Sequence, residues 1–197
     1  MDIASRHTAG VDEVGRGALF GPVVAAAVIL PDCAIASLTA AGVTDSKKLS
    51  AQKRQQLALQ IRQTASCAVG MASVYEIDRI NILQASLLAM RRAVSRLSPQ
   101  PKLCLIDGNQ PIPKLPIEQR TVVKGDLNEL AIAAASIVAK VWRDELIVRL
   151  SDRYPGYDLA SNKGYGSAKH RAGIARQGIC RQHRKSFRSC QVVAAKL

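Results

Sequence analysis

The sequence predicts an α/β domain, because short apolar runs of strand length alternate with longer segments of helical period. About five strands are expected, and the long helices lie between the later ones. The chain has 197 residues, which is enough for one sizeable core. We expect this domain to cover residues 1–158. A small basic helical segment is expected at residues 159–197, and it could belong to the same domain.

Each expected strand is a short apolar run that glycine, proline or polar residues delimit. The strands are expected at residues 9–14, 23–30, 66–74, 103–106 and 120–123. The second of these runs is continuously apolar, which is typical of a strand that is buried on both faces. The first and the later strands each end beside an acidic residue or a glycine, and those ends are considered below.

Three helices are expected around these strands. The first follows Ser50, a residue type that caps helix N-termini, and runs to about Gln63. The second covers residues 83–97, where apolar residues recur three and four positions apart, and a proline-containing stretch ends it. The third covers residues 127–150 and has the strongest helical pattern in the chain, since it is rich in alanine and apolar along one side.

Positive charge is concentrated towards the C-terminus. The formal net charge is +13, Asp158 is the last acid, and residues 159–197 contain nine lysines and arginines. Such a patch is typical of proteins that bind phosphate backbones. Aromatic residues and glycines are interleaved with the charges, which favours a polyanion partner over an acidic membrane or a merely solvated tail.

The cysteines and the apolar runs indicate the compartment. Five cysteines are an odd number without paired C-x-x-C spacing, which argues against a disulfide framework and a zinc site and fits a reducing compartment. The N-terminus lacks the basic and apolar regions of a secretory signal, and no apolar run is long enough to span a bilayer. We therefore expect a soluble, cytoplasmic protein with no membrane partner.

Four carboxylates lie at or just past expected strand ends. They are Asp12, Glu13, Asp107 and Asp126. Ligand sites in α/β sheets form where strands end, and Mg²⁺ takes a few carboxylates together with waters and substrate phosphate, so these residues could converge on divalent cations. Each also has a simpler interpretation: Asp126 with Glu129 resembles a helix-capping box, Asp107 opens a turn, and Asp12 and Glu13 could pair with Arg16.

The glycines after the first strand invite comparison with a dinucleotide-binding loop. Gly15, Gly17 and Gly21 are one residue too widely spaced for G-x-G-x-x-G. That motif also needs a helix directly after the glycines, whereas here an apolar strand pattern follows. The sequence therefore does not predict a nucleotide-binding fold of that kind.

Several longer motifs occur together, and each contains one of the features above. In order they are GVDEVGRG, DSKKLS, LIDGN, VVKGD followed by IAAASIVAKVWRD, NKGYGS and HRKSF. This set spans about residues 9–187 and is highly specific, and through it the chain resembles bacterial ribonuclease HII.

The resemblance implies a ribonuclease H-like fold, in which helices flank a central mixed sheet and a small helical segment follows at the C-terminus. It implies an endoribonuclease that cleaves the RNA strand of RNA–DNA hybrids and single ribonucleotides embedded in duplex DNA. The implied chemistry is two-metal-ion phosphodiester hydrolysis with Mg²⁺ or Mn²⁺, which leaves 3′-hydroxyl and 5′-phosphate ends. No histidine is required for it, and a monomer is expected.

The resemblance also assigns roles to individual residues. The family's catalytic and metal-binding carboxylates correspond to Asp12, Glu13, Asp107 and Asp126. Its Gly-Arg-Gly, which senses the ribose 2′-hydroxyl, corresponds to Gly15, Arg16 and Gly17, and its sugar-packing tyrosine to Tyr165. Phosphate contacts are expected from Ser46 and Lys47.

Two positions depart from the family pattern. Asn162 stands where the family often has His, which puts local phosphate contacts in question. Leu130 stands where the family often has Pro, which concerns how the long helix begins.

Two other functions also fit parts of the sequence. A basic nucleic-acid-binding protein without catalysis would explain the charge, but carboxylates in a phosphate-binding groove repel the ligand unless metals neutralise them. A metal-dependent nuclease of the same fold that acts on branched DNA is the second. Cleavage of a DNA duplex containing one ribonucleotide, compared with all-DNA junctions, distinguishes the two nucleases, and Asp12→Asn and Asp107→Asn test the non-catalytic alternative.

Overall fold

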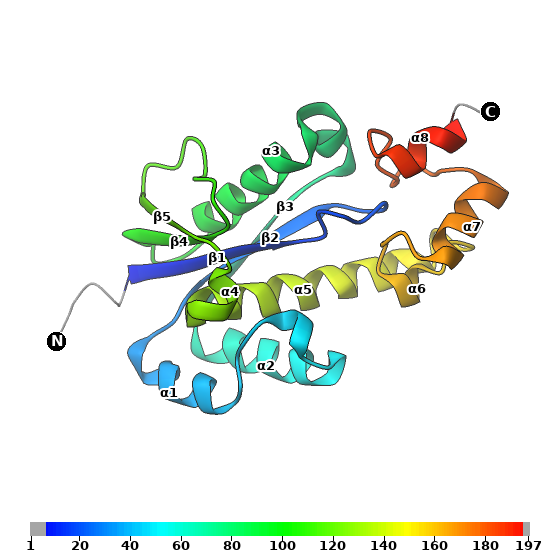
Figure 1. Ribbon diagram of the computed structural model, residues 1–197. Helices are drawn as coiled ribbons and strands as arrows, with labels where there is room; N and C mark the ends of the chain where they lie inside the picture. The colour runs from blue at the N-terminus through cyan, green and yellow to red at the C-terminus, as the bar shows by residue number, and fades with distance from the viewer. Residues whose placement is uncertain (1–6, 195–197) are drawn as a thin grey trace.

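The computed structural model describes residues 7–194, and within them the chain forms one five-stranded mixed sheet with the order β3-β2-β1-β4-β5 (Figure 1). The strands are β1 (Thr8–Val14), β2 (Val23–Ile29), β3 (Ser66–Ala72), β4 (Leu103–Asp107) and β5 (Glu118–Val122). The first three pair antiparallel, whereas β1, β4 and β5 run parallel. All five expected strands and the mixed sheet are confirmed.

Helices cover both faces of this sheet. They are α1 (Asp32–Ala40), α2 (Ala51–Thr64), α3 (Val74–Ser95), α4 (Gly125–Asn128), α5 (Leu130–Ser151), α6 (Leu159–Asn162), α7 (Ala168–Gln177) and α8 (Arg188–Ala194), and a 3₁₀ turn, η2, spans Ser46–Lys48. Figure 1 shows α3 on one face and α5, α2 and α1 on the other. The strand β2 lies between the two apolar layers, and every one of its residues is buried, as its unbroken apolar run predicts.

Two helices differ from the sequence prediction. The helix expected at residues 83–97 begins nine residues earlier as α3, because Ser73 and Glu76 form a reciprocal capping box at its N-terminus. Asn81 interrupts α3 with a non-helical backbone (φ 65°, ψ 166°), so the apolar periodicity is readable only after it. The helix α1 was not predicted at all. Its N-cap, Pro31, offers no side-chain hydrogen bond.

The long helix predicted at 127–150 is two helices in the structure. The chain leaves helical geometry at Glu129 (φ −124°), which separates α4 from α5. The capping-box interpretation of Asp126 is wrong, since the N-cap of α4 is Lys124 and Glu129 caps α5 without a side-chain hydrogen bond. Leu130 occupies the first position of α5, where proline is also well accommodated, so this departure from the family pattern leaves the helix start intact.

The C-terminal helices pack onto the end of α5. A third apolar cluster joins Leu19 and Phe20, which follow β1, to Ile147 of α5 and to Leu159 and Ile174 of the C-terminal segment. The boundary at residue 158 stays a prediction. Among residues 7–194, no helix has the combination of length and apolar composition that crossing a bilayer requires.

Candidate active site

The carboxyl ends of β1 and β4 lie at the same edge of the sheet, because the two strands run parallel with Val11 opposite Ile106. Asp12 and Glu13 follow on β1, and Asp107 is the last residue of β4. Asp126 lies in α4, just past β5. These four carboxylates line one cavity of about 170 Å³.

Neighbouring strand residues point to opposite faces, so Asp12 and Glu13 can share a cavity only where the strand ends. Asp12 lies on the α5 side of β1 with Gly10, where the α-carbon hydrogen of Gly10 allows the backbone of α5 to approach. The chain then turns at Gly15 (φ +92°), which is two residues past Glu13. The Asp12 carboxylate accepts the Glu13 backbone N–H at 2.7 Å, and this contact holds it over the strand end.

Asp107 connects the end of β4 to the start of α4. Its Oδ1 accepts the backbone N–H of Gly125 at 2.8 Å, and Asp126 is the next residue. A side chain at position 125 would collide with Ile132 of α5, since a Cβ there would lie 2.4 Å from the Ile132 Cδ1. Glycine therefore lets α4 dock close enough to place Asp126 beside Asp107.

The charges in this cavity destabilise one another. Burial raises the pKa of the Asp12 carboxyl well above its usual range, and the neighbouring charges of Glu13 and Asp107 raise it further. Burial and the charge of Asp107 also raise the pKa of Glu13 and of Asp126. Negative charge thus accumulates here beyond what the protein neutralises, which is the environment that a bound cation stabilises.

Two cations lie beside the acids and neutralise them only in part. Arg16 Nη1 lies 3.3 Å from Glu13 Oε1, so Glu13 does pair with Arg16. Within the described residues 7–194, no lysine or arginine forms an ion pair with Asp12 or Asp107. Lys47 Nζ lies 3.8 Å from Asp126 Oδ2, and its side chain is 83% exposed. Exposed pairs of this length contribute little, so neither explains why four acids gather at this edge.

The donor set fits a hard divalent cation. All four side chains offer carboxylate oxygens, which are the ligands that Mg²⁺ and Mn²⁺ prefer. Among residues 7–194, no group of three His, Cys, Asp or Glu side chains is arranged so that it could hold a metal ion by itself. Mg²⁺ is commonly held by one or two carboxylates together with waters and substrate phosphate, and the cavity suits that mode.

The same cavity contains three of the expected substrate-binding residues and two residues that the sequence reading missed. Ser46, Lys47 and Tyr165 line it, as do Ser136 and Lys140 from α5. Ser136 and Ser46 share a hydrogen bond of 2.8 Å between their hydroxyl groups, and the Ser136 hydroxyl partly offsets the raised pKa of Asp12. Ser136 and Lys140 are four residues apart in the otherwise apolar first part of α5, residues 130–142, and this spacing was the available signal.

Gly15, Arg16 and Gly17 lie at the rim and are not among the residues that line the cavity. Arg16 and Gly17 are exposed, and a Cβ at Gly17 would meet no atom within 4 Å. The residue after them, Ala18, forms an isolated β-bridge with Tyr165. The structure thus brings the Gly-Arg-Gly segment and Tyr165 side by side next to the carboxylates.

The histidines of the C-terminal segment lie outside the cavity and form a buried pair. The backbone N–H of Cys180 donates to His183 Nδ1 at 3.0 Å, so the proton of His183 is on Nε2, which lies 3.1 Å from His170 Nε2. The remaining N–H of His170 then donates from Nδ1 to the Tyr165 carbonyl at 2.9 Å. This arrangement requires both rings to be neutral.

Acid should therefore destabilise the fold through His183. Burial, and then the proximity of His170, lower the pKa of His183 to about 4, whereas an unfolded histidine titrates near about 6.5. Below about pH 6.5 the unfolded state binds the additional proton, so stability falls by about 3 kcal/mol as the pH approaches 4. An NMR titration should show His183 unprotonated at pH 5.5, and a midpoint near about 6.5 would contradict this assignment.

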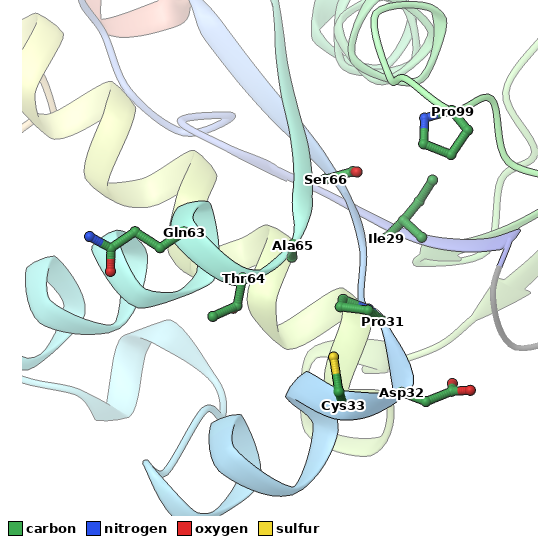
Figure 2. A pocket seen from close by; sticks show the side chains of 9 residues that line it. All are labelled: Ile29, Pro31, Asp32, Cys33, Gln63, Thr64, Ala65, Ser66 and Pro99. Atoms are coloured by element: carbon green, nitrogen blue, oxygen red, sulfur yellow. The ribbon is translucent and has the colours of Figure 1, made fainter.

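A second cavity, of about 690 Å³, is larger, but mostly apolar and uncharged side chains line it (Figure 2). Ile29, Pro31, Cys33, Ser66 and Pro99 are among the residues that line it. Ile29 pairs with Ala9 at the start of β1, so this cavity is at the sheet edge opposite the carboxylates. It offers no cluster of charged groups, and the acid-lined cavity is the better candidate for chemistry.

Comparisons with known proteins identify the family of the chain. The family model described as Ribonuclease HII matches residues 9–190. A ribonuclease HII from Acaryochloris marina (strain MBIC 11017) is 71% identical over 97% of this chain and 97% of its own length, and one from Trichodesmium erythraeum (strain IMS101) is 65% identical over 93% and 88%. A solved structure of the PCNA:RNase HII complex from Archaeoglobus fulgidus matches with a TM-score of 0.78 and 28% identity, over 92% of this chain and 95% of that one. The fold is ribonuclease H-like, and the chain belongs to the ribonuclease HII family and is a nuclease.

Proposed function

We propose that this protein is an endoribonuclease that cleaves the RNA strand of RNA–DNA hybrids and single ribonucleotides embedded in duplex DNA. The observation that carries the proposal is one cavity at which four carboxylates meet, with Gly15-Arg16-Gly17 and Tyr165 beside it. Membership of the ribonuclease HII family supports the same substrate class. A ribonuclease must distinguish ribose from deoxyribose, and here a candidate recognition segment adjoins the acidic residues.

In this proposal Asp12, Glu13, Asp107 and Asp126 hold two divalent cations, Mg²⁺ or Mn²⁺, when substrate phosphate is present. Cations held there would supply activation of the attacking water and stabilisation of the leaving 3′ oxygen, and the expected products are 3′-hydroxyl and 5′-phosphate ends. The carboxylates would supply the negative charge that draws the cations, and a bound cation would offset the burial and the neighbouring charges of Glu13 and Asp107 that raise the pKa of Asp12.

The surrounding residues would bind and orient the nucleic acid. Glycine backbones at 15 and 17 can approach a sugar closely because no Cβ intervenes, and Gly17 has open space around its Cα. Tyr165 would pack on the sugar past the junction. Ser46 and Lys47 form the 3₁₀ turn at the cavity edge, where an exposed lysine suits a phosphate.

We also propose that the protein acts as a monomer in the cytoplasm. Its cysteines Cys33, Cys67, Cys104, Cys180 and Cys190 are free thiols, which fits a reducing compartment. Light scattering during gel filtration checks the monomer, since a dimer would double the measured mass.

The test of this function uses a labelled DNA duplex that contains one ribonucleotide, incubated with Mg²⁺ or Mn²⁺. We expect a single cut beside the ribonucleotide, and no cut in the matched all-DNA duplex or in a branched DNA junction. Survival of the ribonucleotide duplex while the junction is cut would point to a branched-DNA nuclease. Binding of every duplex without a cut would point to a non-catalytic protein.

A further inference from the structure

Two arginines are fully buried behind the Gly-Arg-Gly segment and have no role in the site described so far. Arg143, from α5, and Arg184, between α7 and α8, each have 0% of their surface exposed. Among residues 7–194, no carboxylate forms an ion pair with either guanidinium. Their hydrogen bonds go to backbone carbonyl groups instead.

Arg143 joins the two segments that flank the cavity. Its Nε donates to the Pro22 carbonyl at 3.1 Å and its Nη2 donates to the Phe20 carbonyl at 3.0 Å. Its Nη1 donates to the carbonyl of Lys163 at 2.9 Å, and its Cζ lies 5.5 Å from the centre of the Tyr165 ring. One side chain therefore contacts both the segment after β1 and the segment that carries Tyr165.

Arg184 holds the first of these segments at two further points. Its Nε donates to the Gly21 carbonyl at 3.0 Å, and its Nη1 donates to the Arg16 carbonyl at 2.7 Å. The carbonyl of Arg16 belongs to the Gly-Arg-Gly itself, so this bond reaches directly to the proposed ribose-sensing backbone. The Arg184 Nη2 is buried and has no protein partner among the described residues.

The first glycine of the Gly-Arg-Gly is explained by Arg143. A Cβ at Gly15 would lie 2.1 Å from the Arg143 Nε and 2.7 Å from its Cδ and Cζ, and Gly15 has a φ of +92°. Gly164, which precedes Tyr165, is similarly close to Arg143 and to the segment after β1. A Cβ there would lie 2.7 Å from the Phe20 carbonyl oxygen and 3.5 Å from the Arg143 Nη2. The backbone N–H of Leu19 donates to the Gly164 carbonyl at 2.8 Å.

This arrangement carries an energetic cost. Burial, and then the nearby charge of Arg143, lower the pKa of Arg184 to about 9, and burial lowers the pKa of Arg143. Replacing buried charged side chains by apolar ones of similar volume often leaves the stability of a protein unchanged or increases it. What the guanidinium groups provide is geometry, because the planar fork of donors fixes several carbonyls at once.

We propose that Arg143 and Arg184 are positioning residues for ribose selection, which hold the Gly-Arg-Gly backbone and Tyr165 in one fixed arrangement beside the carboxylates. They act through those residues and do not touch the substrate. This inference rests on the proposed function, because it concerns how that function discriminates between substrates. A single embedded ribonucleotide offers one 2′-hydroxyl and therefore one productive binding position, whereas a continuous hybrid offers many. If the Gly-Arg-Gly backbone and Tyr165 are held less firmly, cleavage of the single ribonucleotide should therefore slow more than cleavage of the hybrid.

The test compares Arg143→Lys and Arg184→Lys with the unmodified protein on two substrates, a duplex with one ribonucleotide and a continuous RNA–DNA hybrid. Lysine keeps the charge but cannot make the divergent hydrogen bonds of a guanidinium. We expect kcat/KM on the single ribonucleotide, divided by kcat/KM on the hybrid, to fall by about 10-fold in each variant. A lower folded fraction would reduce both rates equally, so this ratio separates positioning from stability.

Arg149→Lys is the matched control, since Arg149 is an exposed residue of the same helix, and its ratio should equal that of the unmodified protein. Gly15→Ala should lower the ratio too, because its methyl group would displace Arg143. An unchanged ratio in both Arg143→Lys and Arg184→Lys would overturn the inference. Failure of the unmodified protein to cut either substrate would instead overturn the proposed function.

Discussion

Replacing Asp12 or Asp107 by asparagine should abolish cleavage and leave nucleic-acid binding unchanged or tighter. Both carboxylates line the cavity, and Asp12 is only 6% exposed. Asparagine preserves size but removes the negative charge that would hold a cation, so we expect kcat to fall by about 10³-fold or more, or about 4 kcal/mol. Affinity for a polyanion should not fall, because the substitution also removes a charge that repels phosphate.

The measurements are single-turnover cleavage and a binding titration without metal, on the same ribonucleotide duplex. Asp152→Asn is the matched control, since Asp152 is exposed at the C-terminal end of α5 and should behave as the unmodified protein in both assays. Weaker binding by Asp12→Asn, or cleavage within about 10-fold of normal, would show that these carboxylates do not hold catalytic cations.

The gathering of the four carboxylates at one end of the sheet could be anticipated from the sequence because its signals are local. A strand that ends in an acid and a turn glycine places that acid at the end of the sheet, as for Asp107 before Gly108, and Asp12 and Glu13 lie within three residues of the turn glycine Gly15. Asp126 was ambiguous, since the residues around it also match a capping box. Only the structure shows that Lys124 begins α4 and that the Asp107 carboxylate receives the Gly125 N–H.

The residues that hold the site together were not predictable in the same way. Arg143 lies in a helix beside other charged residues, and Arg184 lies in a basic tail, so both read as solvated surface charges. Their burial depends on the packing of α5 against the segment after β1, which is a contact over more than a hundred residues of sequence. Ser136 and Lys140 were missed for a related reason, because the helix pattern around them indicates only an apolar face.

The prediction errors in the helices have similarly physical causes. Only seven residues of α3 precede Asn81, which breaks the helical period, so the helix became recognisable only after the break. The helix α1 buries only Ala34 and Leu38 and has no side-chain cap, which leaves almost no pattern to read. A helical period is recognisable only when apolar residues recur over several uninterrupted turns, and neither segment is long enough to show it.

Gly10→Ala should cause a large loss of stability and should disable the site with it. A Cβ at Gly10 would lie 2.1 Å from the Ala131 carbonyl carbon and 2.3 Å from the Ile132 nitrogen, both in the backbone of α5. Backbone atoms cannot rotate away as a side chain can, so α5 must separate from β1. We expect a loss of about 3 kcal/mol or more in the free energy of unfolding, measured by urea denaturation.

Separating α5 from β1 should also reduce catalysis, because Asp12, two residues after Gly10, lies beside Ser136 of α5. Gly17→Ala is the matched control for stability, since a Cβ there meets nothing within 4 Å, and its unfolding midpoint should stay close to that of the unmodified protein. Equal midpoints for the two alanine variants would show that α5 does not press on β1 at Gly10. If Gly10→Ala is stable but inactive, the loss of activity comes from a changed position of Asp12 relative to α5, because the substitution alters the distance between β1 and α5.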